Sequence, residues 1–228
     1  MATEGGTKAV VAALLANTGI AITKFVAFLL TGFSSMLAES IHSVADAGNQ
    51  ALLLVGSKQS KREATPEHPF GFGRDRYIYA FVVAIVLFSV GGLYSLYEAY
   101  HKFHEIQLGH GMDVFDSKWR YVPVIVLLIA IVLESLSFRT AIIEGNKDRG
   151  KKGWWTYIKE AKAPELPVIL LEDLAALLGL VFALAAVSLT LIPKNPLFDI
   201  GGTALIGALL VSVAVVLAIE TKSLLIGE

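Results

Sequence analysis

The chain has 228 residues, of which 55% are hydrophobic and 17% are charged, and its formal net charge is −1. Soluble domains usually carry about 25% charged residues, so this composition, with a mean hydropathy of +0.64, indicates a membrane protein. The near-zero net charge gives no reason to expect a nucleic-acid partner. The lack of Cys excludes disulfides and thiolate metal sites, so a metal would need His, carboxylate, amide, backbone or water ligands.

Six apolar segments are long enough to cross a bilayer, because a spanning helix needs about 20 mostly apolar residues. In chain order they cover residues 8–30, 34–58, 77–100, 122–143, 166–191 and 198–217. Gly32 makes a very short link between the first two segments, and residues 193–196 link the last two. We therefore predict an all-α integral membrane protein built as a bundle of six transmembrane helices.

The basic residues predict how the bundle is oriented, because Lys and Arg collect in cytoplasmic loops. Most of them lie at the end of the fourth segment or in the linkers after the second and fourth segments, at Lys61, Arg62, Arg74, Arg76, Arg139, Lys147, Arg149, Lys151, Lys152, Lys159 and Lys162. With six spans, these two linkers share one side of the membrane with both termini. Both termini are therefore expected to be cytoplasmic.

Two apolar segments contain ionisable residues that a membrane helix does not ordinarily keep. His42 and Asp46 lie four residues apart in the second segment, so their side chains point the same way. Glu172 and Asp173 interrupt the fifth segment. Each such group costs about 2.5 to 3.5 kcal/mol at a helix centre on insertion scales. This pattern favours a site for a metal ion or protons inside the membrane.

The depths of these residues agree across antiparallel helices. At about 1.5 Å per residue, Asp46 lies ~18 Å below the outer end of the second segment. Asp173 lies ~11 Å above the inner end of the fifth, which is a similar level in a ~30 Å core. Glu134 and Asn17 come out near the same depth. Hydrogen bonding between helices is an equally open role for Glu134 and the favoured role for Asn17. Lys24 could pair with Glu39 or extend its amine to the interface.

Four stretches of the sequence together resemble one known family, the cation diffusion facilitators, which are divalent-metal/proton antiporters. They are SSMLAESIHSVADAGNQ at 34–50, EHPFGFGRDRY at 67–77, the stretch 17–24, and FDIGGTALIGALLV at 198–211. The likeness covers essentially the whole chain. It implies that residues 1–228 form a transmembrane domain of this family. The cytoplasmic domain that usually follows in the family is not expected within these residues.

The resemblance also implies a set of metal ligands. Family members use two side chains one turn apart on the second span and two on the fifth. Carried over, these positions are His42, Asp46 and Asp173, but the fourth falls on Ile169, which cannot bind metal. Either three protein ligands act with water, or Glu172 or Glu134 substitutes. The surrounding sequence is similar to the branch of the family related to mitochondrial zinc exporters.

The loop after the second span departs from the family pattern as well. Phe72 stands where members with a metal site in this loop carry a second His. A complete loop site at His68 is therefore not expected, and His68 is interpreted as a structural or surface residue.

The function implied by the resemblance is export of a divalent cation from the cytoplasm in exchange for protons, by alternating access. Zn²⁺ is the first expectation for a His and carboxylate site, with Mn²⁺, Fe²⁺ or Co²⁺ as alternatives. The cation is the transported substrate, and no prosthetic cofactor is expected. A homodimer in a bacterial inner membrane is the expected setting.

Three other classes of protein remain as alternatives. An intramembrane metal-dependent hydrolase would also need buried His and acids, but the chain lacks a helical HExxH motif, a nucleophile elbow and Cys. A cation channel would place its acids along a continuous pore. A purely structural membrane protein would bind no metal. The chain is therefore not expected to be an enzyme.

Overall fold

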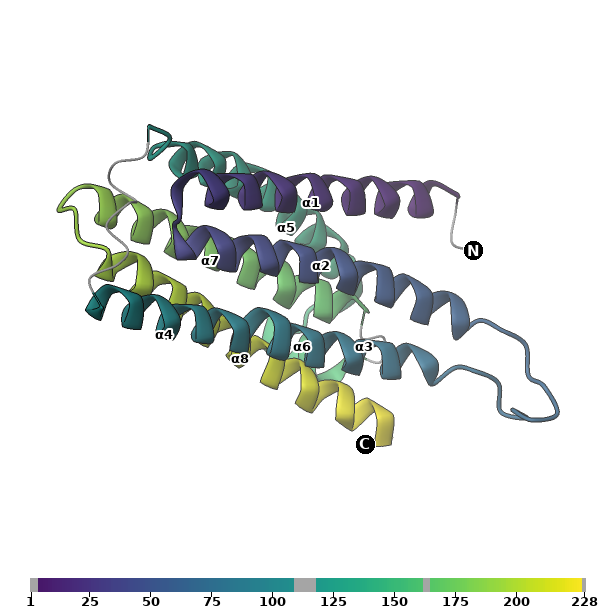
Figure 1. Ribbon diagram of the computed structural model, residues 1–228. Helices are drawn as coiled ribbons and strands as arrows, with labels where there is room; N and C mark the ends of the chain where they lie inside the picture. Colours follow the sequence, from purple (N-terminus) through teal and green to yellow (C-terminus); the bar gives the residue numbers. More distant parts are fainter. Residues whose placement is uncertain (1–3, 109–117, 162–164, 227–228) are drawn as a thin grey trace.

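The computed structural model describes residues 4–108, 118–161 and 165–226, and these fold almost entirely into helices (Figure 1). In this part of the chain the only pairing of β type is an isolated bridge between Thr65 and His68. The helices are α1 (Glu4–Thr31), α2 (Ser34–Gln59), α3 (Asp75–Val86), the π-helical η1 (Leu87–Leu93), α4 (Tyr94–Gln107), α5 (Val122–Arg149), α6 (Trp154–Glu160), α7 (Glu165–Leu191) and α8 (Leu197–Ile226).

All six apolar segments are helical, as predicted. The third is the continuous run of α3, η1 and α4, and α5 and α8 extend beyond their expected ends to Arg149 and Ile226. By length and composition, four helices in the described residues could cross a membrane, at Tyr77–Gln107, Val122–Arg149, Leu166–Leu191 and Leu197–Ile226, and Asn17–Thr31 is a shorter apolar helix. The helix α2 is less apolar, because it carries the polar residues of the candidate site. Six crossings and cytoplasmic termini remain predictions.

The turn between α1 and α2 is as tight as the sequence indicates. Gly32 has a φ of 74°, a left-handed conformation that glycine adopts without the steric cost of a Cβ atom. Its N–H donates to the carbonyl of Phe28 at 2.7 Å, and Phe33 then takes an extended conformation before α2 begins. The two helices therefore run back along each other over most of their length.

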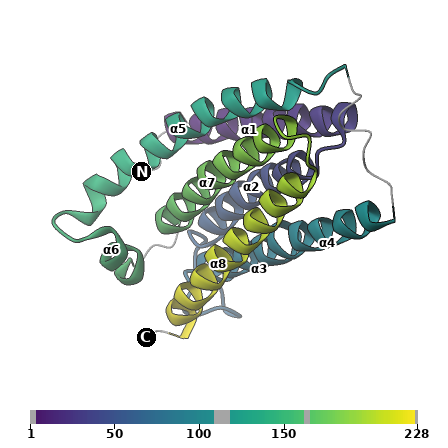
Figure 2. The same cartoon turned by 90° about the vertical axis from the view of Figure 1, so that its left-hand side faces the viewer.

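The long helices form three layers in the two ribbon views (Figures 1 and 2). The helices α1 and α5 lie on one side, α2 and α7 lie in the middle, and α8 lies with α3 and α4 on the other side. The helix α2 contacts α1, α3, α7 and α8, and α7 contacts α5 and α8. Side chains on the facing surfaces of α2 and α7 are therefore enclosed by the bundle.

The short helix α6 packs beneath α5 and α7, away from this centre. Its Tyr157 is buried against Ala141 and Leu170 and donates a hydrogen bond of 2.8 Å to Asp148. Burial and this bond raise the pKa of the Tyr157 hydroxyl, so it stays protonated as a donor. This contact fastens the end of α5 to the linker that leads into α7.

In the loop between α2 and α3, the His68 side chain packs against a neighbouring aromatic ring. The exposed His68 ring stacks on the Phe72 ring with 4.6 Å between centroids, and the Arg62 guanidinium lies 4.8 Å from the centroid of the same Phe72 ring. Phe72 therefore stabilises the loop by stacking, in agreement with the structural or surface role expected for His68.

Candidate metal site between the central helices

His42 and Asp46 lie together on the buried face of α2. The His42 Nδ1 and Asp46 Oδ1 atoms are 3.4 Å apart, and the His42 side chain is completely enclosed. Both ring nitrogens of His42 and the Oδ1 atom of Asp46 are buried without a hydrogen-bond partner. A buried polar atom left unpaired costs about 1–3 kcal/mol, so these atoms suit a ligand that supplies the missing partner.

The two acids of α7 turn toward different neighbouring helices. Consecutive residues in a helix are rotated by about 100°, and Glu172 accepts a hydrogen bond of 2.7 Å from the Asn49 amide of α2. Asp173 instead accepts a bond of 3.0 Å from the Ser137 hydroxyl of α5. Both carboxylates are buried. The depth argument therefore placed the right helix beside α2, and the rotation of α7 divides its two acids between partners.

Several charged groups act on Asp46 from the surrounding helices. They are Glu172 and Asp173 of α7, Glu134 of α5 and Lys24 of α1. The α2 half of the site is therefore surrounded by further ionisable side chains from α1, α5 and α7.

The four predicted ligands on α2 and α7 do not converge on one point as a coordination shell would. Within the described residues, no three His, Asp or Glu side chains converge as a metal cluster would require. His42 and Asp46 meet directly, whereas Glu172 and Asp173 are held by Asn49 and Ser137. Ile169 packs against the hydrophobic core. Bringing an α7 carboxylate to His42 and Asp46 would therefore require it to leave its present partner.

Lys24 and Glu39 form a buried ion pair, one of the two arrangements left open by the sequence. The Lys24 amine lies 2.9 Å from Glu39 Oε2 and also donates to the Ser43 hydroxyl at 2.8 Å. The other Glu39 oxygen lies against α7 where a Cβ atom added at Gly179 would be 2.6 Å from it. The pair therefore joins α1, α2 and α7 next to the site.

Asp199 has a structural role that sequence reasoning did not assign. Its carboxylate, at the start of α8, accepts hydrogen bonds from the backbone N–H of Ser34 at 2.7 Å and of Ser35 at 3.2 Å, and from the Ser35 hydroxyl. The first N–H groups of a helix have no partner within the helix. Asp199 thus caps α2 from another helix, and its only sequence signal was an acid at the start of an apolar segment.

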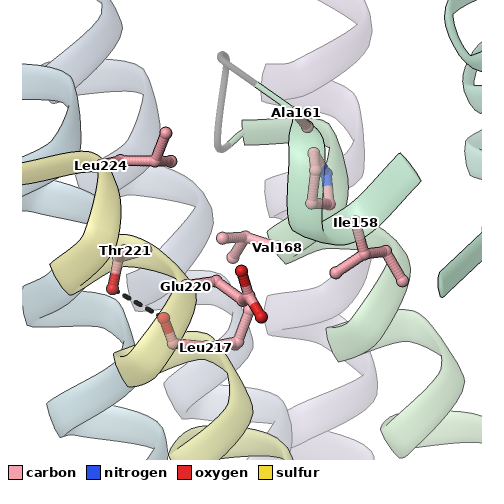
Figure 3. A pocket seen from close by; sticks show the side chains of 8 residues that line it. Ile158, Ala161, Val168, Leu217, Glu220, Thr221 and Leu224 are labelled. Carbon is pink, nitrogen blue, oxygen red and sulfur yellow. Dashed lines mark hydrogen bonds between the residues drawn. The ribbon is translucent and has the colours of Figure 1, made fainter. Parts of the chain in front are cut away.

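The described residues enclose three pockets near the long helices, and the largest, of about 590 Å³, is lined mainly by apolar side chains of α1 and α2. The other two contain acidic side chains and differ in size. The one between α6, α7 and α8 has about 10 Å³ of space, enough for about one water molecule, and Glu220 lines it from α8 (Figure 3). The neighbouring Thr221 hydroxyl bonds to the Leu217 carbonyl in its own helix. The other pocket, of about 330 Å³, lies between α1 and α5 and is lined by Asn17 and Glu134.

The sequence matches the family model described as the cation efflux transmembrane domain over residues 10–226. It is 35% identical over 227 residues to "Proton-coupled zinc antiporter SLC30A9, mitochondrial" of Xenopus laevis, covering 99% of this chain and 39% of that protein. The human protein of the same name is 33% identical, with the same coverage. "Metal tolerance protein C4" of Arabidopsis thaliana is 28% identical over 97% of this chain and 47% of its own length.

The chain thus spans about two fifths of the length of these antiporter relatives. Their names describe antiporters and a metal tolerance protein, which agrees with the expectation that the chain is not an enzyme. A family model that covers nearly the whole chain, together with these identities, confirms the resemblance seen in the sequence. The chain belongs to the cation efflux family of membrane proteins, the cation diffusion facilitators.

Proposed function

We propose that this protein is a secondary transporter that moves a divalent cation, with Zn²⁺ favoured, out of the cytoplasm in exchange for protons. The substrate site is formed by His42 and Asp46 of α2 with Asp173 and Glu172 of α7. Support for Zn²⁺ comes from the mixed His and carboxylate donors, which suit tetrahedral zinc, and from the zinc antiporters to which the chain is similar.

The observation that carries the proposal is the unpaired state of the α2 side chains. His42 is fully buried with two unpartnered nitrogens, and an unpartnered Asp46 oxygen lies beside it. Structural His and Asp residues in a membrane interior normally find hydrogen-bond partners. A transport site must instead keep its donor atoms available for a cation that binds and leaves.

The exchange with protons follows from ligand chemistry. A metal ion binds deprotonated imidazole and carboxylate groups, so its binding releases protons and its departure allows them to return. Two protons for each Zn²⁺ would make the cycle electroneutral.

The α7 carboxylates supply the movable half of the proposed site. Asn49 and Ser137 hold Glu172 and Asp173 by single hydrogen bonds. Arrival of a divalent cation at His42 and Asp46 would draw these anions inward, because the attraction to a double charge exceeds that of one neutral donor. We propose that this closure accompanies the switch of access from one side to the other.

The setting of the transporter is part of the proposal. We propose six membrane crossings, cytoplasmic termini and a homodimer, as expected from the sequence. The expected bacterial plasma membrane remains a prediction, because the names of the antiporter relatives specify mitochondria.

The test is Zn²⁺ flux in liposomes that hold the purified protein under an imposed pH gradient. We expect His42→Ala, Asp46→Ala and Asp173→Ala each to abolish proton-coupled flux. Glu144→Ala is the matched control, because Glu144 is exposed and pairs only with Lys147 on the same helix. Near-normal transport by Asp46→Ala would overturn the site assignment.

Glu172→Ala tests, in the same assay, which group supplies the fourth metal ligand in place of Ile169. A severe loss of flux would place Glu172 among the ligands, and a mild loss would leave water in that position. A cation channel, the remaining alternative, would instead pass a voltage-driven current without proton exchange.

A further inference from the structure

The pocket between α1 and α5 contains polar groups that the proposed transport site does not use. It has a volume of about 330 Å³ and opens to the surface of the chain. Asn17 of α1 and Glu134, Ser137 and Thr140 of α5 line it together with apolar side chains. A purely apolar crevice would suit lipid, whereas amide, hydroxyl and carboxylate oxygens suit a hydrated cation.

Glu134 is the informative residue of this pocket. The residue is only 7% exposed, and it forms no hydrogen bond or ion pair with any residue that the structure describes. Four other buried acids differ from it, since Glu39, Glu172, Asp173 and Asp199 all have hydrogen-bond partners. A buried carboxylate without a partner is strongly unfavourable, so Glu134 is suited to hold a positive ligand in the pocket.

The pocket adjoins the proposed transport site through α5. Ser137, three residues after Glu134 and on the same wall, donates its hydroxyl hydrogen bond to Asp173. A cation in the pocket would therefore be separated from Asp173, one of the ligands that we assign to transport, by the Ser137 side chain.

We propose that Glu134 and Asn17 form a separate loading site, where a divalent cation binds with part of its water shell before it reaches His42 and Asp46. This inference rests on the proposed function. The donors in the pocket are all oxygens, and oxygen ligands favour cations that keep water. Each water occupies about 30 Å³, so a pocket of this size accommodates an ion with several waters. The enclosed His42 and Asp46 site, in contrast, requires the ion to shed them.

The test measures initial rates of Zn²⁺ transport over a range of Zn²⁺ concentrations in liposomes. Glu134→Gln keeps the shape and removes the charge, and we expect KM to rise about tenfold while kcat is retained, as for loss of a ground-state contact. Asn17→Asp adds a carboxylate to the same pocket and should lower KM. Glu144→Gln, an identical exchange on the exposed face of α5, should leave both constants unchanged.

Equilibrium binding of Zn²⁺ to the detergent-purified protein gives a second readout. The wild type should show a tight and a weak class of site, and Glu134→Gln should lose only the weak class. Asp46→Ala should lose the tight class and retain the weak one. If Glu134→Gln does not fold, Asn17→Asp still tests the proposal through its opposite effect on KM and on the weak class.

Two results would overturn the loading site while leaving the transport function intact. An unchanged KM for Glu134→Gln and Asn17→Asp would show that the pocket holds no cation on the path. A loss of kcat and of tight binding in Glu134→Gln would make Glu134 a ligand of the transport site itself. Absence of Zn²⁺ flux and binding in the wild type would instead refute the proposed function.

Discussion

The Asn49 side-chain amide of α2 donates a hydrogen bond of 2.7 Å to the Glu172 carboxylate of α7. Asn49 lies three residues after Asp46, on the same buried face of α2. The bond therefore fixes the Glu172 carboxylate against the helix that carries His42 and Asp46. Asn49, which is not among the predicted ligands, thus holds one of the two α7 carboxylates against α2.

Asn49→Ala should weaken Zn²⁺ binding by roughly tenfold, because loss of a group that orients a ligand typically costs 10- to 100-fold in metal affinity. Equilibrium Zn²⁺ binding to the purified protein measures the change. Asn146→Ala is the control, since the Asn146 amide is exposed and bonds only to Arg149. Unaltered affinity in Asn49→Ala would show that Glu172 does not depend on this bond for its role.

The Lys24–Glu39 pair should couple strongly in a double-mutant cycle. Removing one member of a buried ion pair costs about 3–5 kcal/mol, because it leaves an uncompensated charge. We therefore expect Lys24→Met and Glu39→Gln each to lower the free energy of unfolding by that order. The double variant should be more stable than the sum of the single losses predicts. Denaturant unfolding in detergent micelles measures all four proteins, and simple additivity would contradict the pair as a structural unit.

Asp199→Ala should destabilise the protein by roughly 2–4 kcal/mol, since hydrogen bonds to charged groups contribute about 1.5–3 kcal/mol each and buried donors would be left unpaired. Asp199→Asn keeps one acceptor oxygen for the Ser34 and Ser35 N–H groups, and should lose less. Thermal unfolding of the two variants in the same detergent compares them. Equal losses would show that the negative charge, and not the number of acceptors, carries the cap.

The neighbouring glycines Gly201 and Gly202 of α8 allow a test of how closely α7 and α8 are packed, because only Gly202 faces α7. A Cβ atom at Gly202 would lie 2.2 Å from the Ala186 Cβ atom, whereas one at Gly201 would meet nothing within 4 Å. Gly202→Ala should therefore cost about 1–3 kcal/mol through overpacking. Gly201→Ala should be neutral or gain up to about 1 kcal/mol in helix propensity.

Unfolding of both glycine variants in detergent measures this difference. Transport by Gly201→Ala should equal that of the wild type. A tolerated Gly202→Ala, with stability unchanged, would mean that α7 and α8 separate without cost.

The helices of the fold were predictable because the signal is local. A run of about 20 apolar residues forms a helix in which every backbone group is paired, whatever its neighbours are. The ends were less predictable, and α5 and α8 continue into polar residues because a helix does not stop where a hydrophobic run ends. Polar residues such as His42 and Asp173 were found because they interrupt those runs.

Rotation about each helix axis, and the choice of lateral neighbours, were decided only by the tertiary structure. Depth follows from residue number at a fixed rise, so the level shared by Asp46 and Asp173 could be calculated. The division of Glu172 and Asp173 between Asn49 and Ser137 depends on how α7 turns between α2 and α5. The cap on α2 joins Asp199 to Ser34 and Ser35, which lie 165 and 164 residues earlier in the chain. The sequence by itself determined which residues are polar and where along its helix each one lies, and packing between helices decided which of them meet.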